Sequence, residues 1–331
     1  MTDAAPVIRD FESTLRRLAH DESPDPRLVY GLSGPASADV AVWAAIWPAI
    51  DPERRRWIAL ELLGTAQGSF EVDFEALFRR LLSDEDPATR AAAVDGLWEA
   101  DDPRLIEPFV DLLTRDPDSA VRARAAAGLG TYVLLGELAK IGRDRVERAV
   151  TALVDAATDE SEDLEVRRRA TESAGYADRD DVRVLIEDAA EATEPELVAA
   201  ALRAMGRSAD DGWADAVLAQ LESALAAVRF EAARAAGELS LEAAVPTLFV
   251  LAEEDEPEIQ TEAVWALGEI GGRAARRALE RLASGADDDL AEAIDDALAT
   301  LALGESEVEW GALGPFDAGL DADDVEDERS E

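Results

Sequence analysis

The sequence offers few of the side chains that catalyse reactions or bind metals. It contains no Cys, and its single His is His20. A lone His has no second His or Cys with which to share a metal ion, and no nucleophile stands in a recognisable motif with it. We expect His20 near the end of an N-terminal helix, where an imidazole interacts favourably with terminal carbonyls. The sequence therefore indicates no catalytic residue, no cofactor and no metal site.

Short motifs of the common enzyme classes are also missing. The chain has no Walker A sequence, no G-x-S-x-G and no H-E-x-x-H. The glycines of "GEIGG" at 268–272 indicate a helix end, because no strand precedes them. The acidic stretch 321–327 lacks the glycine that a calcium-binding EF-hand loop needs at its sixth position. These absences favour a protein that is not an enzyme.

A different set of residues points to binding. Arginines and aromatic residues recur at one helical phase in a chain with 32 basic and 74 acidic residues, and these two types are enriched at binding hot spots. We predict that they form a ridge that contacts a protein partner. The predicted residues are Arg124, Arg169, Tyr176, Arg203, Arg207, Arg234 and Trp265. The alternative is a ladder of Arg–Glu pairs between adjacent repeats, which needs no ligand.

The segments that carry these residues repeat along the chain. An apolar residue, an Ala four positions later and a Gly nine positions later recur every 31 residues from Val166 through Leu197, Val228 and Ile259. An earlier copy begins at Val121, 45 residues before Val166, and a degenerate last copy begins at Leu290. We call the apolar residue the anchor, and the helix that contains it the anchor helix.

Each copy is predicted to form two helices. Apolar residues at helical spacing precede a turn that often holds Asp-Pro or Glu-Pro, as at Asp86-Pro87 and Glu256-Pro257. The residue before a proline avoids the helical region, so the first helix ends there. The Gly is interpreted as the terminator of the anchor helix, and the Ala as a point where two helices approach closely. One such hairpin cannot bury its apolar face alone, so the fold class is all-α, an alpha-alpha superhelix of about eight stacked hairpins.

The segments "VRARAAAGLG" (121–130), "VRRRATESAG" (166–175) and "VRFEAARAAG" (228–237) resemble HEAT repeats. The short period is similar to that of the HEAT-like repeats in phycobilin lyase subunits. The resemblance implies that the arginine after each anchor pairs with a turn aspartate, which here concerns Arg90, Arg122, Arg167 and Arg229. Deoxyhypusine hydroxylases share the repeat and bind two irons through His-Glu pairs, which this chain lacks. The repeat serves many unrelated roles, so the resemblance is specific for fold and weak for function.

Two functions follow as hypotheses. The first is a non-enzymatic scaffold or adaptor that binds a protein partner on the concave face, which anchor helices line in HEAT solenoids. The second is an accessory subunit of an enzyme, by resemblance to bilin lyase subunits. Nucleic acid is disfavoured as a ligand, because phosphate contacts need basic surface.

The two ends of the chain depart from the repeat. Residues 1–50 are expected to form N-terminal helices and an atypical capping repeat, with Trp43 stacked on Trp47, and residues 51–303 the solenoid. Residues 304–331 are expected to form an acidic, disordered tail in which Trp310 and Phe316 are a candidate docking motif. The extra residues after Val121 fall in 131–150 and predict a lengthened anchor helix. This helix is either a second candidate partner site or an insertion that the solenoid tolerates without a binding role.

The charge balance points to a salt-rich environment. The formal net charge is −42 and Lys140 is the only lysine, a composition that resembles that of extreme halophiles. Molar salt shortens the Debye length to about 3 Å and screens such self-repulsion. The N-terminal sequence has no signal-peptide pattern, and no apolar run approaches the ~20 residues that span a bilayer. We therefore expect a soluble, cytoplasmic protein.

The excess of carboxylates predicts that folding depends on salt. Unscreened repulsion opposes stacking of the repeats at low ionic strength, so the melting temperature should rise from 0.05 M toward molar KCl. Circular dichroism at 222 nm measures this directly. A melting temperature that stays constant across the series would contradict the prediction.

Overall fold

A computed structural model describes residues 10–312 of the chain, with side chains to Leu303. Over these residues the chain is helical and contains no β-strand. A first helix, α1 (Phe11–His20), is followed by eight hairpins, each made of an outer helix and an anchor helix. The outer helices are α2 (Ser37–Ile46), α4 (Glu75–Leu81), α6 (Ile106–Arg115), α8 (Arg143–Thr158), α10 (Asp180–Ala190), α12 (Ala214–Gln220), α14 (Val245–Leu251) and α16 (Gly272–Leu282). The anchor helices are α3 (Pro52–Gly68), α5 (Pro87–Asp95), α7 (Ser119–Glu137), α9 (Leu164–Ala174), α11 (Pro195–Arg207), α13 (Ala226–Glu238), α15 (Pro257–Ile270) and α17 (Asp288–Ala312).

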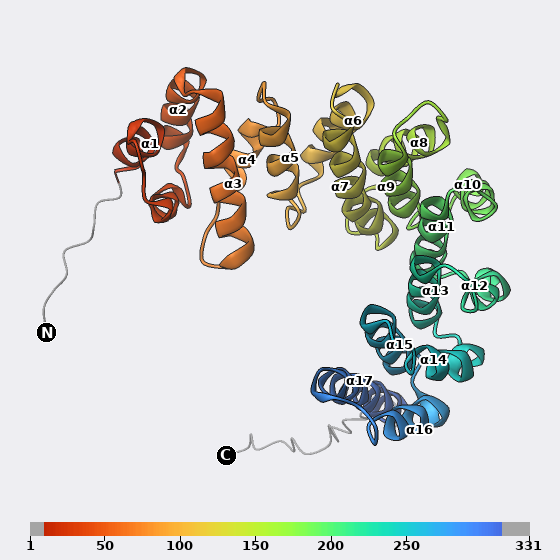
Figure 1. Ribbon diagram of the computed structural model, residues 1–331. Helices are drawn as coiled ribbons and strands as arrows, with labels where there is room; N and C mark the ends of the chain where they lie inside the picture. Colours follow the sequence, from red (N-terminus) through yellow and green to blue (C-terminus); the bar gives the residue numbers. More distant parts are fainter. Residues whose placement is uncertain (1–9, 313–331) are drawn as a thin grey trace, which may run out of the picture. The chain divides into compact units, whose positions relative to one another are not determined.

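The hairpins form two compact units, one ending at Ala235 and the other beginning at Ala236. In the N-terminal unit the odd-numbered helices from α3 onward line the inner side of the arc, and α8, α10 and α12 lie outside (Figure 1). Consecutive anchor helices pack side by side from α3 to α11. The prediction of an all-α superhelix with anchor helices on the inner side is confirmed for this unit.

Several local predictions are confirmed as well. His20 is the last residue of α1, and the rings of Trp43 and Trp47 stack with centroids 4.3 Å apart. Proline opens α5, α11 and α15, after an extended Asp or Glu. The extra residues after Val121 lengthen α7 to 19 residues.

One boundary needs correction. We expected helical structure to stop at Gly304, but α17 continues to Ala312. A glycine inside a helix costs only about 1 kcal/mol relative to alanine, so it does not end a helix by itself. The remainder of the predicted tail, with Phe316, lies outside the described residues, and no side chain of Trp310 is described.

The anchor helices meet at small residues. The Ala four positions after the anchor is fully buried at Ala125, Ala170, Ala201 and Ala263, as predicted from close approach. The Gly nine positions after the anchor lies against the next anchor helix in the later repeats. A Cβ added to Gly175 would lie 2.5 Å from the Cα of Ala204 on the next anchor helix.

This second observation corrects our interpretation of the glycines. A C-terminal glycine cap has a left-handed backbone, but the repeat glycines have negative φ, and Gly175 has φ −56°. Gly237 and Gly268 likewise face Ala266 and Ala297, with Cβ positions 2.9 and 3.0 Å from those Cα atoms. These glycines therefore permit close packing between neighbouring repeats. The anchor helices also end close to them, as predicted: Gly175 is the C-cap of α9, and α13 and α15 end one and two residues after Gly237 and Gly268.

Arginine after the anchor connects successive hairpins at the turns. Arg90 donates through Nε and Nη2 to Asp116 of the next turn, at 2.7 Å each, and through Nη1 to the Asp84 carbonyl at 2.8 Å. Arg122 likewise reaches Glu162 at 2.6–2.8 Å, and Arg56 bonds both carboxylate oxygens of Asp86. We call these three pairs, Arg56–Asp86, Arg90–Asp116 and Arg122–Glu162, the turn ladder.

The turn ladder confirms the expected partner for Arg90 and refines it for Arg122, whose partner is a glutamate. It does not extend to the other two arginines in the same way. The contacts described for Arg167 and Arg229 are to carbonyl oxygens, of Ala157 at 3.2 Å and of Ser223 at 2.9 Å.

None of the described helices is long and apolar enough to cross a membrane.

The packing role of the glycines predicts an asymmetry between two Gly-to-Ala changes. Gly175→Ala should lower the free energy of unfolding by about 1–3 kcal/mol, because the added methyl group collides with backbone of α11. Gly64→Ala is the control: Gly64 also lies in an anchor helix but has nothing within 4 Å of its Cβ position. That change should stabilise slightly, by about 0.5–1 kcal/mol, through helix propensity. Denaturant titration measures both, and equal effects would disprove the assignment.

The turn ladder predicts a pH signature at Asp86. The hydrogen bond from Arg56, with those from Thr89, holds the pKa of this carboxyl below its usual range. Its charge therefore stabilises the fold above the unfolded pKa of about 3.9, and this contribution is lost as pH falls through the lower folded value. Asp86→Asn should cost about 1.5–3 kcal/mol at pH 7, and the difference from wild type should shrink only below about pH 4.

A matched control separates the ion pair from the helix cap. Both Asp86 and Asp118 cap an anchor helix, by accepting from Thr89 N and from Ala120 N. Asn is as good a cap as Asp, and among the residues with described side chains Asp118 has no ion-pair partner within 4 Å. Asp118→Asn should therefore be nearly neutral, and an equal loss in both variants would assign the effect to capping.

Candidate functional site

Helix α9, one of the anchor helices on the inner side, carries two arginines that share two glutamates. Arg169 donates through Nε to Glu165 Oε1 at 2.9 Å and through Nη1 to Glu172 Oε2 at 3.3 Å. Arg168 reaches the same carboxylates at 2.7 and 2.5 Å. Glu172 is buried, whereas 40% of the Arg169 side chain is exposed. The guanidinium of Arg169 is thus exposed to solvent beside the buried carboxylate of Glu172.

Helix α11 adds two further arginines to this surface. Arg207 Nη1 donates to the backbone carbonyl of Glu172 at 2.7 Å, and its guanidinium lies 4.9 Å from the ring centre of Tyr176. Arg203 Nη1 lies 3.5 Å from Glu231 Oε2 of α13. We call Arg168, Arg169, Arg203 and Arg207, with Tyr176, the inner arginine cluster.

The structure therefore brings together Arg169, Tyr176 and Arg207 through Glu172, and places Arg203 on the same pair of helices. Arg234 lies on α13, its guanidinium 5.0 Å from the ring centre of Phe230. Arg124 is apart from the cluster, paired with Asp95 of α5 at 2.8 Å. Trp265 belongs to the C-terminal unit, on α15, where it is 38% exposed.

The alternative of an Arg–Glu ladder describes some of these contacts. Arg124–Asp95 and Arg203–Glu231 each connect neighbouring anchor helices, as the ladder requires. Arg169 does not, because both of its partners lie on its own helix. The ridge as a binding site stays a prediction.

The electrostatics of the cluster suit binding rather than proton transfer. The hydrogen bond from Arg168 lowers the pKa of Glu165, and the same bond raises the pKa of Arg168. Both groups therefore stay charged through the neutral range. A general acid or base needs a pKa near the working pH, so neither is suited to that role. Over the residues with described side chains, no group of three His, Cys, Asp or Glu is placed to hold a metal ion.

A small apolar groove lies on the inner side of α3, α5 and α7. Its volume is about 380 Å³. Leu60 is 49% exposed beside it. The residues lining the groove include Leu60, Leu63, Ala88, Ala91 and Arg124. The groove was not predicted from the sequence, because only charged and aromatic residues at one helical phase were considered as binding residues. Leu60 and Leu63 are neither.

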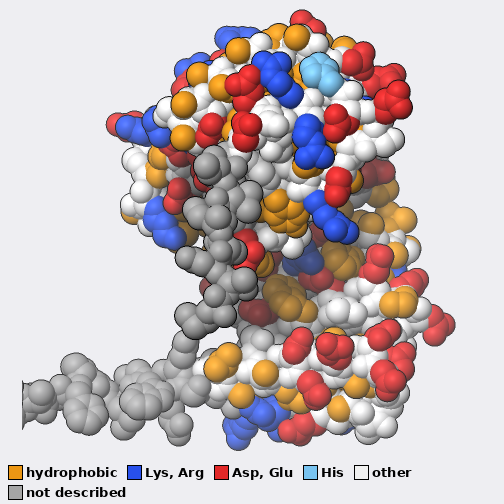
Figure 2. All heavy atoms as spheres, turned by 90° about the vertical axis from the view of Figure 1, so that its left-hand side faces the viewer, with side chains coloured by type: hydrophobic (Ala, Val, Ile, Leu, Met, Phe, Trp, Pro, Cys, Tyr) orange, Lys and Arg blue, Asp and Glu red, His pale blue; other side chains and the backbone are white. Residues whose placement is uncertain are grey.

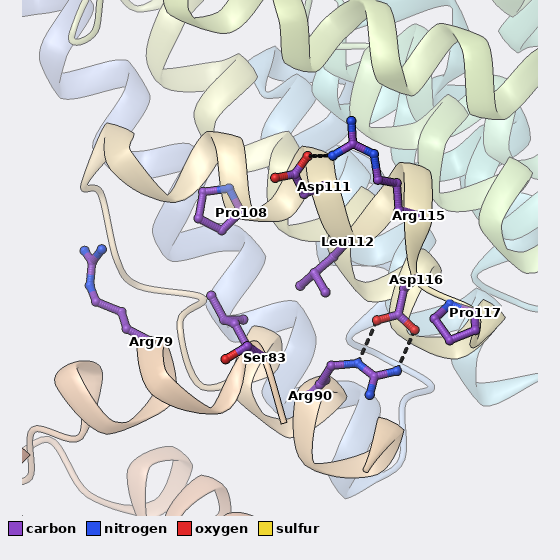
Figure 3. A pocket seen from close by; sticks show the side chains of 10 residues that line it. Arg79, Ser83, Arg90, Pro108, Asp111, Leu112, Arg115, Asp116 and Pro117 are labelled. Carbon is purple, nitrogen blue, oxygen red and sulfur yellow. Dashed lines mark hydrogen bonds and ion pairs between the residues drawn. The ribbon is translucent and has the colours of Figure 1, made fainter. Parts of the chain in front are cut away.

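A second depression, of about 620 Å³, lies between the α4–α5 turn and α6 (Figure 3). All three of its arginines are already paired, Arg90 with Asp116 and Arg115 with Asp111 at 2.6 Å, and Arg79 with Glu75 at 2.7 Å and Asp102 at 2.5 Å. Leu112 forms an apolar part of its lining between these pairs. Its main charged groups thus serve the turn ladder and a same-helix pair.

Comparison with known proteins agrees with the architecture. The model of HEAT repeats matches residues 74–164 and 214–299. Human deoxyhypusine hydroxylase in complex with glycerol is 19% identical, with a TM-score of 0.35, over 89% of this chain and 96% of that one. The complex of CpcE and CpcF of phycocyanin lyase from Nostoc sp. PCC7120 is 19% identical, with a TM-score of 0.47, over 69% of this chain and 94% of that one.

A larger protein also resembles the chain. The Kap95:Nup1 complex matches at 12% identity and a TM-score of 0.46, over 92% of this chain and 49% of that one. No curated protein sequence matches the chain. These structural likenesses concern the fold alone. The two segments matched by the repeat model span more than half of the 331 residues, and the chain belongs to the HEAT-repeat family.

Proposed function

We propose that the protein is a non-enzymatic scaffold that binds a protein partner on the inner face of its N-terminal unit. The inner arginine cluster, with Arg124 and Arg234, forms the contact surface, and the partner presents carboxylates to it. Arginine suits this role because its planar guanidinium binds carboxylates bidentately and stacks on aromatic rings. Trp265, on the other unit, is proposed as a further partner contact.

The observation that carries the proposal is the local charge balance. Helices α9, α11 and α13 together contain seven arginines and five glutamates. The whole chain contains 32 basic and 74 acidic residues, and acidic side chains are spread over the face shown in Figure 2. An inner surface with a local positive excess steers an acidic partner toward itself and away from the rest of the molecule.

The apolar groove extends the proposed surface toward α3. It is large enough for one apolar side chain of the partner, and Arg124 beside it offers a guanidinium to a neighbouring carboxylate. An acidic segment with an apolar residue fits this arrangement. Interfaces commonly combine such an apolar anchor with surrounding polar contacts.

The role of accessory enzyme subunit, as in the phycocyanin lyase complex of CpcE and CpcF, makes a different prediction. A subunit of that kind should co-purify with one fixed partner subunit or with a chromophore absorbing above 300 nm. We further propose that the protein works in concentrated salt, which its net charge of −42 favours.

The test is recovery of partners by the full-length chain and by a double variant, Arg169→Glu with Arg203→Glu. Arg169 and Arg203 are 40% and 21% exposed, and their pairs with the partly exposed Glu165 and Glu231 are worth about 0–1 kcal/mol each. The buried Glu172 keeps its pair with Arg168, so the fold should survive. We expect recovery to fall at least tenfold, equivalent to about 1.4 kcal/mol of binding free energy. Circular dichroism and the melting temperature verify folding.

The matched control changes two arginines of outer helices, Arg115→Glu with Arg183→Glu. These alter the net charge equally and also remove ion pairs, to Asp111 and to Asp210. Partners should be retained by this variant. Equal loss in both variants would indicate a general effect of charge, and full retention in both would move the binding surface away from the inner face.

A further inference from the structure

Helix α16 of the C-terminal unit has an unusual charge for this chain. It carries Arg273, Arg276, Arg277 and Arg281 against a single acidic residue, Glu280. No other described helix has so large an excess of arginine. Its apolar side, with Ala275 and Leu279, is buried in the unit, so the arginines lie on the opposite, solvent-facing side.

Two of these arginines have no anionic partner among the described residues. Arg281 lies over the ring of Phe249, at 4.6 Å, but Arg273 and Arg277 form no ion pair or side-chain hydrogen bond with residues 10–303. They are four positions apart and therefore lie on the same side of the helix. Like charges at this spacing destabilise a helix slightly, so an anion bound between them would be favourable.

The chain itself supplies a suitable anion close by. Residues 313–331 follow α17 directly and contain eight Asp and Glu residues against one Arg. Six of the acids fall within 321–328. Helix α17 packs against α16, so this segment starts from the neighbouring helix of the same unit.

The geometry of the chain permits the contact. Nineteen residues follow Ala312, and an extended chain covers about 3.3–3.6 Å per residue, whereas α16 with its 11 residues is only about 16 Å long. A tethered segment has an effective local concentration in the millimolar range. It therefore has an advantage over free acidic ligands at the same surface.

We propose that Arg273 and Arg277 of α16 bind the acidic segment 321–328 of the same chain. The contact is made by guanidinium–carboxylate pairs and covers the basic side of α16. It is independent of the partner surface proposed for the N-terminal unit. An external acidic partner of α16 would have to displace this segment first.

The absence of cysteine from the chain allows a direct test. In the full-length protein, Ala274→Cys on α16 and Ala322→Cys in the acidic segment are labelled with a donor and an acceptor dye. Energy transfer is measured at the lowest KCl concentration at which the circular dichroism spectrum is native. We expect efficient energy transfer in the protein with both arginines. In the double variant Arg273→Glu with Arg277→Glu, the fraction of molecules with the segment docked should fall at least fivefold. An excess of unlabelled protein, which leaves intramolecular transfer unchanged, distinguishes it from contact between copies.

Two further variants decide the outcome. Arg27→Glu with Arg145→Glu alters the net charge equally at two exposed arginines of the other unit and should leave transfer high. Adding Asp323→Arg and Asp324→Arg to the α16 variant reverses both charges and should restore transfer. Three results would each overturn the proposal. They are low energy transfer in the labelled protein that keeps Arg273 and Arg277, an equal loss of transfer in the control variant, and failure of the charge reversal to restore transfer.

Discussion

Stacking of the later repeats depends on the close approach of consecutive anchor helices at a glycine. Gly175 packs against the backbone at Ala204, and Gly237 and Gly268 pack in the same way against Ala266 and Ala297, contacts that together we call the seam. Only small side chains permit this distance, so the seam is the part of the repeat with the least freedom. Helix length is not so restricted: α5 has 9 residues and α7 has 19. Insertions are tolerated because they extend helices away from the seam.

The turn ladder acts at a second, less uniform point. Arg90 and Asp116 are both largely buried, with side-chain exposures of 10% and 3%. Removing one member of such a pair leaves an uncompensated charge and costs about 3–5 kcal/mol. Yet the equivalent positions in α11 and α15 are Val198 and Gln260, which carry no guanidinium. The ladder therefore connects the early repeats, whereas close glycine contacts with the next anchor helix occur at Gly130, Gly175, Gly237 and Gly268 and not at Gly64.

The sequence period predicted the number of hairpins, the proline-opened helices and the stacked tryptophans, because each follows from local rules of packing and backbone geometry. It predicted correctly that the anchor helices end near the repeat glycines, but it did not predict that these glycines pack against the next anchor helix, since a helix end and a close contact both select Gly. The partners of Arg169 were not predictable, because a long side chain reaches acids on its own helix as easily as those on the next. The apolar groove was missed since Leu60 lies outside the helical phase compared.

The two kinds of arginine differ in what they contribute to the fold. Arg90 is held by a buried carboxylate and by backbone carbonyls, so it is committed to stacking. Arg169 is 40% exposed and pairs with acids on its own helix, an arrangement worth only about 0.3–0.5 kcal/mol per pair. Its exchange from an intrahelical glutamate to an incoming carboxylate costs little. Arg169 therefore adds little to stability, and a pair between it and a partner's carboxylate, as we propose, would leave the seam undisturbed.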